Sequence, residues 1–427
     1  MMATHLAYLM KQEGHRVKLF IDDPDRKDSF KNLVDKTDDW RKELKWVGRG
    51  ANSLIVFDDV GYGKIQDRLR KDGYSVFGGS ALADRLEEDR QYAYEIFTMA
   101  GMKTVPVKNF DTIQSAIDFV KKNKGAWVIK QNGNASKSLN YVGHYDDGRD
   151  VINMLKNYRQ NNKKGLGTIT LQEKVHGVEI AVSRYFNGND WVGPIELNIE
   201  HKKFFSGDIG PATSEMGTLA WHCNDGNDKL FQETLLKLKP HLQKIDYRGA
   251  IDINCIVNGA GAYPLEATPR FGSPIVYLQS EINSSPWSIF LKAIADGEQY
   301  DLKWKRGYGI VVLLATPPFP YLKKLQEISP KGVNIYFSET LEKSGLEHIY
   351  FEGVALRSTK GEKQYFISDH QGYVLYATAV SHTIEITRNK INKLIKDIYI
   401  PKMFYRHDIG MSFIKDTNKR LQRWGYV

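Results

Sequence analysis

This sequence has little cysteine, and it lacks long apolar runs and a secretory leader. Its two cysteines, Cys223 and Cys255, are too few for a disulfide framework, and no Cys or His cluster suggests zinc. The best apolar run, residues 310–315, is much shorter than the ~20 residues of a membrane-spanning helix. The first residues show no basic segment followed by an apolar one. We therefore expect a cytoplasmic protein with two free thiols and no membrane contact.

Positive charge exceeds negative charge, since 60 Lys and Arg face 51 Asp and Glu and give a net charge of +9. This balance favours anionic partners such as nucleotides, sugar phosphates or nucleic acid. The lysines are scattered along the chain, however, so an ordinary solvated basic surface is the default explanation. The length of 427 residues, of which 41% are hydrophobic, predicts a globular chain of two or three domains.

The central stretch of the sequence is residues 249–274, where two predicted strands flank a turn. Strand periodicity places Asp252 and Asn254 on one face of the first strand. It likewise places three residues on one face of the second, namely Glu266, Thr268 and Arg270. Carboxylate and amide oxygens are ligands for Mg²⁺, and arginine stabilises charge on a phosphoryl group or an oxyanion. An ordinary hairpin with a surface ion pair explains these residues equally well.

The N-terminal part of the chain alternates short apolar segments, such as residues 53–57 and 76–77, with helical patterns. This alternation predicts a parallel α/β domain. In such sheets ligands bind beyond the carboxyl ends of the strands, here near residues 58–63 and 78–80. A single helix is predicted to follow, over residues 82–100.

A second candidate site begins where an apolar strand ends in Lys130 and a small polar loop, residues 131–138, follows. A cation beside flexible backbone amides suits nucleotide phosphates. Gly133 also lets the backbone approach a ligand closely. Because Asn-Gly-Asn is typical of an ordinary turn as well, both interpretations stay open on these residues alone.

Three segments of the sequence resemble the phosphoribosylamine–glycine ligase family of the ATP-grasp superfamily. Residues 265–274 (LEATPRFGSP) are similar to that family's E-x-N-x-R-F-G-D-P-E. Residues 200–217 (EHKKFFSGDIGPATSEMG) resemble its D-H-K-R…G-D-x-G-P-N-T-G-G-M-G, and residues 405–410 (YRHDIG) resemble its Y-R-x-D-I-G. The order and spacing of the three segments are those of the family.

The resemblance implies an α/β ATP-grasp fold built from four units. These are an N-terminal parallel α/β (pre-ATP-grasp) domain at 1–101, a small ATP-grasp lobe at 102–182, a large ATP-grasp lobe at 183–305 and a C-terminal β-rich domain at 306–427. In the family, a first strand and a glycine-rich turn precede the helix predicted here over residues 3–14. This sequence begins at that turn, so we expect a domain that lacks its first strand, through truncation or a late start, and an altered sugar-phosphate site.

The resemblance also implies that the chain binds ATP with Mg²⁺ or Mn²⁺. Residues 130–138 are similar to the family's phosphate-binding loop, Arg90 stands where the family has a lysine, and residues 172–175 match its adenine hinge. The hinge bonds adenine through its backbone, and a carboxylate suits the vicinal hydroxyls of ribose. The implied residues are Arg90, Lys130 and Lys137 for the phosphates and Glu173, Val175 and Glu179 for the nucleoside.

The implied metal site departs from the family pattern. Glu266 matches one family ligand, but Thr268 replaces the asparagine that is the other. We therefore expect Asp252, together with Asn254, to compensate from the neighbouring strand, because two carboxylates restore the charge that Mg²⁺–ATP needs.

The acceptor end differs from the family as well. The family's N-T-G-G is Ala212-Thr-Ser-Glu215 here. A negative charge at Glu215 would repel a sugar phosphate and favour a cationic amine; equally, Glu215 is explained as an ordinary surface residue of a loop. The acceptor residues that the resemblance implies are Lys202, Lys203 and Arg270, with a catalytic role, and Asp208, Pro211, Thr213 and Glu215, which would contact substrate.

These residues together predict an ATP-dependent carboxylate–amine ligase that works through an acyl phosphate, with Arg270 stabilising the oxyanion. Phosphoribosylamine and glycine, the substrates of purine biosynthesis in the family, are the first candidates. The changed acceptor loop and the missing turn nevertheless predict weak or no synthesis of glycinamide ribonucleotide. Two alternatives stay open: a diverged paralogue that joins another small acid to another amine, even one carried on a nucleic acid, and a non-catalytic nucleotide-binding protein.

Overall fold

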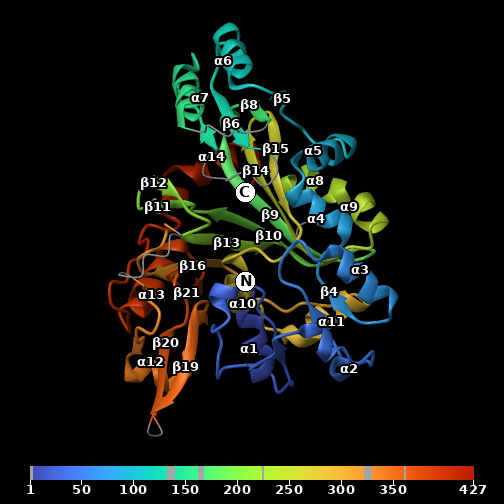
Figure 1. Ribbon diagram of the computed structural model, residues 1–427, viewed down its shortest axis with the longest axis vertical. Coiled ribbons are helices and arrows are strands. Elements are labelled where there is room, and N and C mark those ends of the chain that lie inside the picture. Colours follow the sequence, from blue (N-terminus) through green and yellow to red (C-terminus); the bar gives the residue numbers. More distant parts are fainter. Residues whose placement is uncertain (1–2, 132–139, 162–167, 224–225, 322–328, 360–361) are drawn as a thin grey trace.

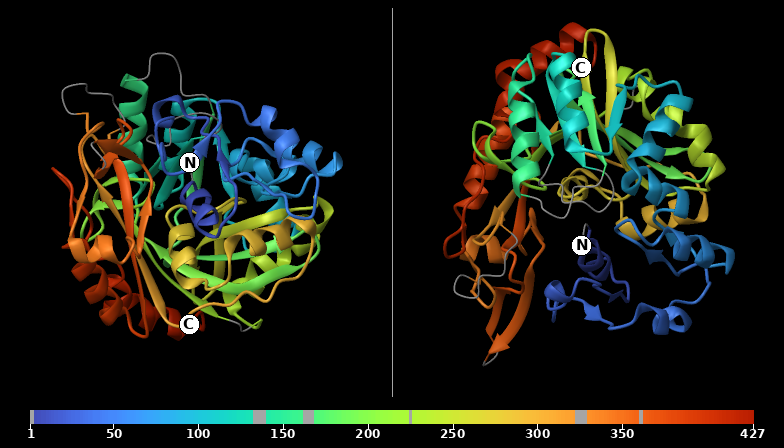
Figure 2. Two further views of the ribbon diagram at one scale, coloured as in Figure 1. Left: turned by 90° about the horizontal axis from the view of Figure 1, so that it is seen from below. Right: turned by 45° about the horizontal axis from the view of Figure 1, so that its top comes forward.

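The structure, a computed structural model, describes residues 3–131, 140–161, 168–223, 226–321, 329–359 and 362–427 (Figure 1). Figures 1 and 2 show a small lobe (cyan to green) at one end of the molecule and a large sheet in the middle. The N-terminal unit (blue) and a C-terminal hairpin (orange) lie at the opposite end. Within the described ranges, no helix combines the length and the apolar character that crossing a membrane requires.

The N-terminal unit, residues 3–101, has the predicted alternation of helices and short parallel strands. Strand β1 pairs in parallel with β2, and β3 pairs in parallel with β4. The elements are α1 (His5–Gln12), β1 (Lys18–Leu19), β2 (Asp35–Lys36), α2 (Leu44–Val47), β3 (Ile55–Val56), α3 (Gly63–Lys71), β4 (Val76–Phe77), α4 (Ala81–Glu88) and α5 (Arg90–Met99).

The prediction of one helix over residues 82–100 is wrong, because the chain forms two helices there, α4 and α5. Asp89 lies between them with an extended backbone, and its Oδ1 accepts a hydrogen bond from the backbone N of Tyr92 at 3.1 Å. An aspartate in this position caps the helix that follows it. The cap redirects the chain just before Arg90, the first residue of α5.

The small lobe contains a four-stranded sheet in the order β5-β8-β6-β7. Two helices, α6 and α7, pack on it around a separate apolar cluster that includes Ile117, Leu155 and Leu171. The elements are β5 (Val107–Phe110), α6 (Ile113–Lys122), β6 (Trp127–Gln131), β7 (Tyr141–Val142), α7 (Arg149–Asn161) and β8 (Ile169–Glu173).

The large sheet has eight antiparallel strands in the order β15-β14-β9-β10-β13-β16-β21-β18. Its strands are β9 (Val178–Asn187), β10 (Trp191–Glu200), β13 (Gly217–Cys223), β14 (Arg248–Asn258), β15 (Gly261–Thr268), β16 (Tyr308–Ala315), β18 (Ile349–Phe351) and β21 (Tyr373–Ser381). Strand β9 spans the 182/183 boundary, and β16, β18 and β21 come from beyond 305, so the division into four units stays a prediction.

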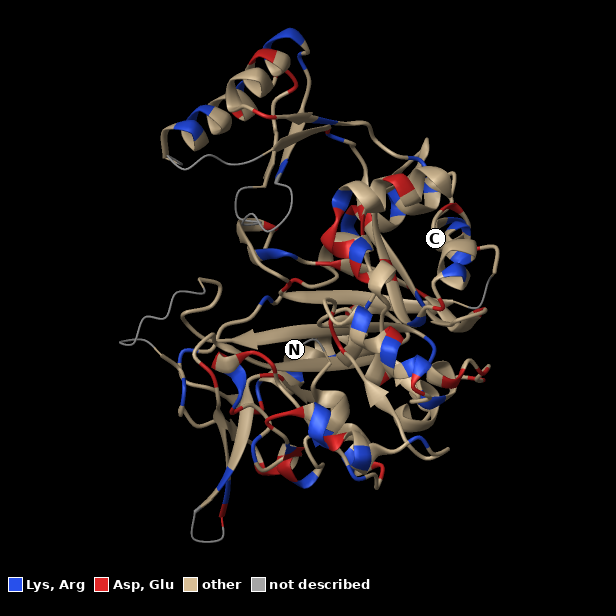
Figure 3. Ribbon diagram, turned by 45° about the vertical axis from the view of Figure 1, so that its right-hand side comes forward, with Lys and Arg blue, Asp and Glu red and all other residues tan. Residues whose placement is uncertain are grey.

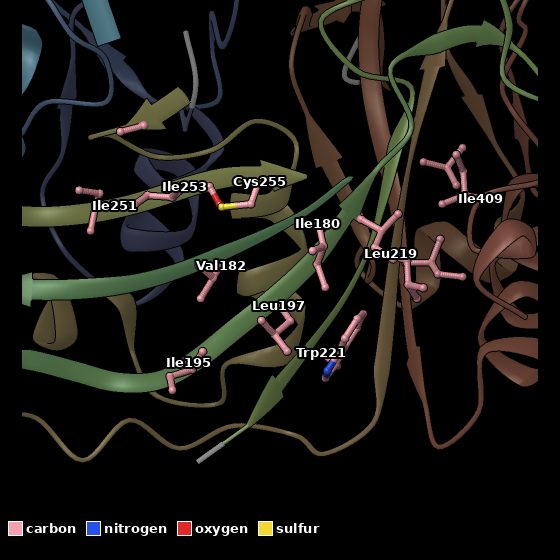
Figure 4. Close-up of a cluster of buried hydrophobic side chains, with 14 of the residues drawn as sticks. Ile180, Val182, Ile195, Leu197, Leu219, Trp221, Ile251, Ile253, Cys255 and Ile409 are labelled. Carbon is pink, nitrogen blue, oxygen red and sulfur yellow. The ribbon is translucent and has the colours of Figure 1, made fainter. Parts of the chain in front are cut away.

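Helices cover both faces of the large sheet, which explains why its strands are apolar almost without alternation. On one face α8 (Lys229–Glu233) and α9 (Leu235–Lys244) share a core with β9 and β14. Figure 4 shows this core, in which Ile180, Leu197 and Ile253 come from neighbouring strands and the buried, free Cys255 lies among them. On the other face α10 (Ile275–Ile282) and α11 (Trp287–Asp296) pack around a second core.

The C-terminal segments are rich in β structure, as the sequence predicts, and they extend the large sheet. Phe30 N donates to Val354 O at 2.8 Å, which joins the N-terminal unit to these segments. The remaining elements are β11 (Lys203–Phe205), β12 (Ile209–Ala212), β17 (Tyr336–Phe337), α12 (Glu339–Lys343), β19 (Val354–Thr359), β20 (Glu362–Ile367), α13 (Ile384–Ile395), β22 (Ile398–Tyr399) and α14 (Asn418–Trp424).

Candidate active site

Strands β14 and β15 form the hairpin that the sequence predicts, and the structure gives its register. Asp252 lies opposite Thr268, and Asn254 lies opposite Glu266. Asp252 and Asn254 are only 6% and 4% exposed, whereas the Glu266 side chain is 51% exposed. The two strands therefore present a buried acid and amide beside an accessible carboxylate, all from residues predicted to bind metal.

Lys202 is the centre of the charged groups at this site. Its Nζ lies 2.9 Å from Glu179 Oε1, 2.8 Å from Glu200 Oε2 and 3.8 Å from Glu266 Oε1. Burial disfavours the charge of Lys202, but the carboxylates outweigh burial and raise the pKa of this lysine. The structure thus brings together Glu179, predicted to bind ribose, Glu266, predicted to bind metal, and Lys202, predicted to be catalytic.

Glu200 is a site residue that the sequence reasoning missed. It pairs with Lys202, and the Nδ2 of Asn254 lies 3.4 Å from both of its carboxylate oxygens. The sequence did contain a signal for this residue, because Glu200 stands where the family motif D-H-K-R has its aspartate.

Two acidic side chains close to Lys202 are buried. Burial, reinforced by the charges of Glu200 and Glu196, raises the pKa of Asp252 well above its usual range, and Asn198 Nδ2 donates to Asp252 Oδ2 at 3.2 Å. Burial likewise raises the pKa of Glu215, which is 5% exposed and accepts a hydrogen bond from the hydroxyl of Thr218. Glu215 is therefore not a surface residue, which corrects one of the two explanations given for it.

The predicted phosphate-binding cations Arg90 and Lys130 lie close enough to interact. Burial, followed by the charge of Arg90, lowers the pKa of Lys130 to about 8, while Glu266 opposes that shift. Burial also lowers the pKa of Arg90, again against the charge of Glu266. Side chains from α5, β6 and β15 therefore converge, and an anion would relieve the repulsion between the two cations. Lys137 lies outside the described residues.

The predicted adenine hinge, residues 172–175, begins in the last two residues of β8. Glu173 is exposed at that end, and the backbone N of Lys174 donates to Ala126 O at 2.8 Å. Val175 is half-buried, and Glu179 follows on β9 with its side chain 43% exposed. The hinge therefore connects the small lobe directly to the large sheet beside Lys202.

Arg270 connects the hairpin to the N-terminal unit. Its Nη2 donates to Glu87 Oε1 at 2.7 Å, its Nε lies 3.3 Å from Asp59 Oδ1, and its Nη1 donates to Phe271 O at 2.9 Å. Burial disfavours the charge of Arg270, but Glu87 and Asp59 outweigh it and raise the pKa. The guanidinium group is thus held in place by two carboxylates.

The acceptor loop is held by the C-terminal motif. Arg406, which is 1% exposed, donates from Nη1 to Asp208 Oδ1 at 2.7 Å and to Lys203 O at 2.9 Å, and it pairs with Asp408 at 2.7 Å. The Oγ1 of Thr213 donates to Lys202 O at 2.8 Å. Asp208 and Thr213 therefore support the loop that carries Lys202.

Two predicted acceptor residues lie beside this support. Lys203 is exposed, and its Nζ donates to Gly210 O at 3.3 Å. Pro211 is half-buried in β12. Within the described residues, no side-chain contact connects either of them to the charged groups around Lys202.

The donor atoms of the site suit a hard divalent cation. Among the described residues, no three His, Cys, Asp or Glu side chains already form a group that could hold a metal ion. The Oδ1 of Asn254 is nevertheless buried without a hydrogen-bond partner in the described part of the chain, and it lies on the strand beside Glu266. An orphaned amide oxygen next to carboxylates fits Mg²⁺, which takes oxygen ligands.

Two other features lie apart from the residues predicted individually. A cavity of about 460 Å³ is lined by residues that include Arg70, Lys71 and Lys244, and its lining reaches Ser80, in the stretch 78–80 where a ligand is expected. Figure 3 shows Lys and Arg (blue) spread over the whole molecule rather than gathered in one patch, as an ordinary basic surface would have them.

Comparison with known proteins agrees with the predicted fold and family. Residues 88–275 match the model of the phosphoribosylglycinamide synthetase ATP-grasp (A) domain. The chain is 24% identical over 369 residues to the phosphoribosylamine–glycine ligase of Clostridium acetobutylicum, which covers 82% of this chain and 81% of that protein.

Solved structures show the same fold. The structure superposes on phosphoribosylamine–glycine ligase of Thermotoga maritima with a TM-score of 0.69 and 21% identity, over 95% of this chain and 97% of that one. It also superposes on the biotin carboxylase domain of Hydrogenobacter thermophilus 2-oxoglutarate carboxylase, solved with MgADP, ADP and bicarbonate, with a TM-score of 0.60 and 12% identity over 98% and 92% of the two chains. The predicted fold class is confirmed: the chain has the ATP-grasp fold and is similar to the phosphoribosylamine–glycine ligases.

Proposed function

We propose that this chain is an ATP-dependent ligase that joins a carboxylate to an amine through an acyl phosphate. The observation that carries the proposal is the convergence on Glu266, whose charge acts on both Arg90 and Lys130 and whose Oε1 lies 3.8 Å from the Nζ of Lys202. Cations gathered around an accessible carboxylate suit the polyphosphate of a nucleotide with its divalent ion. The relatives, which are named phosphoribosylamine–glycine ligases, support the same reaction class.

The binding roles in this proposal are those that the resemblance implies. Arg90 and Lys130, with Lys137 beyond the described residues, bind the phosphates. Glu179 accepts from the ribose hydroxyls, and the backbone of Glu173 and Val175 bonds the adenine edge. Glu266, Asp252 and Asn254, with Thr268 beside them, would hold Mg²⁺ or Mn²⁺, which when bound neutralises charge on the transferring phosphoryl group.

The reaction needs two displacements, and the residues divide between them. A carboxylate oxygen of the acid forms a bond to the γ-phosphorus of ATP, the bond to the β-phosphate oxygen breaks, and ADP leaves. The amine nitrogen then forms a bond to the acyl carbon, the carbon–oxygen bond to phosphate breaks, and phosphate and a proton leave. Arg270 stabilises the oxyanion of the second step, and Lys202 offsets charge in the first.

The first test is nucleotide binding. Calorimetric titration with Mg²⁺ and a non-hydrolysable ATP analogue should show binding to the wild-type chain. Lys130→Met should weaken that binding roughly tenfold or more, about 1.4 kcal/mol. Lys122→Met, which removes an exposed lysine of the same lobe on α6, is the matched control and should change nothing.

The second test is turnover. ADP release should require both a carboxylic acid and an amine, and a panel of amino acids with phosphoribosylamine and other amines identifies the pair. If titration with the ATP analogue at millimolar concentration gives no heat of binding, ATP binding is contradicted. Binding without ADP release for any pair would favour a non-catalytic nucleotide-binding protein instead.

A further inference from the structure

The cavity of about 460 Å³ lies where the N-terminal unit meets the large sheet. Part of its lining comes from α3 and the start of α4, and the rest comes from the segment that joins the end of α9 to the start of β14. In Figure 1 these helices lie on the same side of the molecule. Pockets of roughly 300–1,000 Å³ are typical of small-molecule sites, and they often lie between structural units. Of the described residues that line this cavity, none is proposed to bind ATP, metal or substrate, so a ligand here would be an additional one.

Cations outnumber carboxylates in this lining, and we call it the cationic cavity. Its cations are Arg70, Lys71, Lys244 and Arg248, and its carboxylates are Asp67 and Asp246. Both carboxylates already face an arginine, since Asp246 Oδ1 lies 2.9 Å from Arg248 Nε and Asp67 Oδ1 lies 3.6 Å from Arg70 Nη1. The two lysines are exposed and form no ion pair within the described part of the chain. Four cations against two carboxylates leave two positive charges without a counter-charge in the lining.

Arg70 is the buried cation of the cationic cavity, with a side chain that is 9% exposed. Its Nε donates to Val76 O at 3.3 Å, its Nη1 to Gly79 O at 2.7 Å and its Nη2 to Gly78 O at 3.1 Å. These bonds fix the guanidinium group against the loop after β4. An arginine has five N–H groups, so two remain, and Asp67 Oδ1 at 3.6 Å is too far away to accept a hydrogen bond. Arg70 can therefore donate to an anion in the cavity.

Cations from the two sides of the cationic cavity repel each other. Burial lowers the pKa of Arg70, and the charge of Arg248 lowers it further, against the opposing charges of Asp246 and Asp67. The two sides are in direct contact, because Gly78 N donates to Arg248 O at 2.8 Å. A buried cation whose charged form is disfavoured is stabilised by an anion beside it. Because Arg70 belongs to the N-terminal unit and Arg248 to the large sheet, such an anion would join the two units.

Apolar side chains complete the lining of the cationic cavity. Tyr74 and Ile245 are half-buried, and Leu82 is 41% exposed. The guanidinium group of Arg49 lies 4.7 Å from the centre of the Tyr74 ring, which adds a further cation near this wall. These apolar surfaces suit the organic part of a ligand whose charged end meets the cations.

A phosphate monoester has the charge and the shape that these features require. Its phosphate carries about −1.5 to −2 charge at pH 7 and offers three acceptor oxygens, which matches two unbalanced positive charges. Arginine and lysine are the side chains that bind phosphate through charge-assisted hydrogen bonds.

We propose that the cationic cavity binds a small phosphate monoester, whose phosphate lies between the cations of both sides and whose organic part packs on Tyr74, Leu82 and Ile245. The bound phosphate joins α3 to the segment between α9 and β14 and so holds the N-terminal unit against the large sheet. The site is additional to the ATP site, and the inference does not depend on the ligase reaction.

Three compounds that separate charge from apolar surface test the proposal. Phenyl phosphate has both, inorganic phosphate has only the charge, and benzamide has only the ring. They are titrated calorimetrically into the full chain saturated with Mg²⁺ and the ATP analogue, so that the ATP site is occupied. Phenyl phosphate should bind at least roughly fivefold more tightly than inorganic phosphate, because an apolar ring leaves water, and benzamide should give no heat at the same concentration. Phenyl phosphate should also raise the Tm, since a ligand of the folded state stabilises it.

Two variants place the binding in the cationic cavity. Lys71→Met and Lys244→Met each remove an exposed cation, one from each side. Each should weaken the binding of phenyl phosphate by roughly threefold, the modest effect of an exposed charge, and should leave the Kd of the ATP analogue unchanged. Lys64→Met, at an exposed lysine in the first turn of α3 outside the cavity lining, is the matched control and should bind phenyl phosphate like the wild-type chain.

Four results would overturn the inference. They are no heat with phenyl phosphate, no preference for it over inorganic phosphate, an affinity unchanged in both test variants, and an equal loss in the control. Binding that disappears when the ATP analogue is present would place the anion in the ATP site and would overturn the inference as well. If the chain fails to bind the ATP analogue, the ligase proposal is contradicted, while the same titrations without the analogue still test the cationic cavity through its variants.

Discussion

Arg270 Nη2 donates a hydrogen bond to Glu87 Oε1 at 2.7 Å, across 183 residues of sequence. The pair joins the loop after β15 to α4 and so connects the large sheet to the N-terminal unit. A guanidinium group held in this way needs little reorganisation when charge develops beside it, which is the condition for efficient electrostatic stabilisation. The pair is therefore a structural link between the two parts, and in the proposed reaction it would hold Arg270 in place.

Arg270→Lys should lower kcat by roughly a hundredfold, the usual cost of removing one oxyanion donor. Lysine keeps the charge but cannot pair with Glu87 and Asp59 together in the fixed geometry of a guanidinium group. The Kd of the ATP analogue should change less than about threefold, since Asp59 and Glu87, the carboxylates that pair with Arg270, are not among the residues proposed to bind ATP. Arg248→Lys, at an arginine paired with Asp246, is the control, and an equal loss of kcat in both variants would mean a general effect on stability.

Affinity for ATP should weaken as the pH rises through about 8. Burial and Arg90 lower the pKa of Lys130 to about 8, so this lysine is charged below that pH and neutral above it. Only the charged form attracts phosphate, and the Kd should rise by up to about tenfold per pH unit above 8. Lys130→Arg keeps its charge throughout and should show a much smaller slope between pH 7 and 9. Identical slopes in the two chains would exclude Lys130 as the cause.

Asp252→Asn should lower turnover at least roughly tenfold, about 1.4 kcal/mol, and weaken its dependence on Mg²⁺. Thr268→Asn, directly across the hairpin, should be tolerated or helpful. Because burial raises the pKa of Asp252, a cation that binds this carboxyl displaces a proton, so the heat of Mg²⁺–nucleotide binding should depend on the buffer. Asp190→Asn, at an aspartate paired with Lys239, is the control. Unchanged turnover and Mg²⁺ dependence would show that Asp252 is structural.

The free energy of unfolding should lose a His5 contribution as the pH falls from about 6.5 to about 3. Burial lowers the pKa of His5 to about 3, and its Nδ1 accepts from Phe351 N at 2.8 Å. Below about pH 6.5 this histidine binds a proton in the unfolded chain but not in the folded chain. The free energy of unfolding therefore falls by up to about 1.4 kcal/mol per pH unit. Urea unfolding at pH 7 and pH 5 should show a smaller pH effect in His5→Gln than in wild type. His176→Gln, at an exposed histidine, should match wild type, and a pH effect unchanged in His5→Gln would contradict the prediction.

Local pattern was enough to predict some features of the site. The alternation of residues 249–268 gave the faces of the hairpin, because side chains on a strand alternate with a period of two. The prediction was wrong for Arg270, which lies beyond the end of β15 at Thr268. Local pattern was also enough for the short parallel strands of the N-terminal unit. It failed at residues 82–100, where the pattern of apolar residues continues across Asp89 but the cap of α5 does not allow one helix.

By itself the sequence determined the fold class, the order of the motifs and the shared strand face of Asp252 and Asn254, all of which depend on near neighbours or on letters of a motif. Only the tertiary structure decided that Glu200 joins Lys202, that Glu215 is buried, that Glu87 and Asp59 hold Arg270, and that cations of two units line one cavity. The physical reason is that burial and charge pairing depend on packing between segments distant in sequence. Periodicity gives the face on which a side chain lies, but packing decides what that face meets.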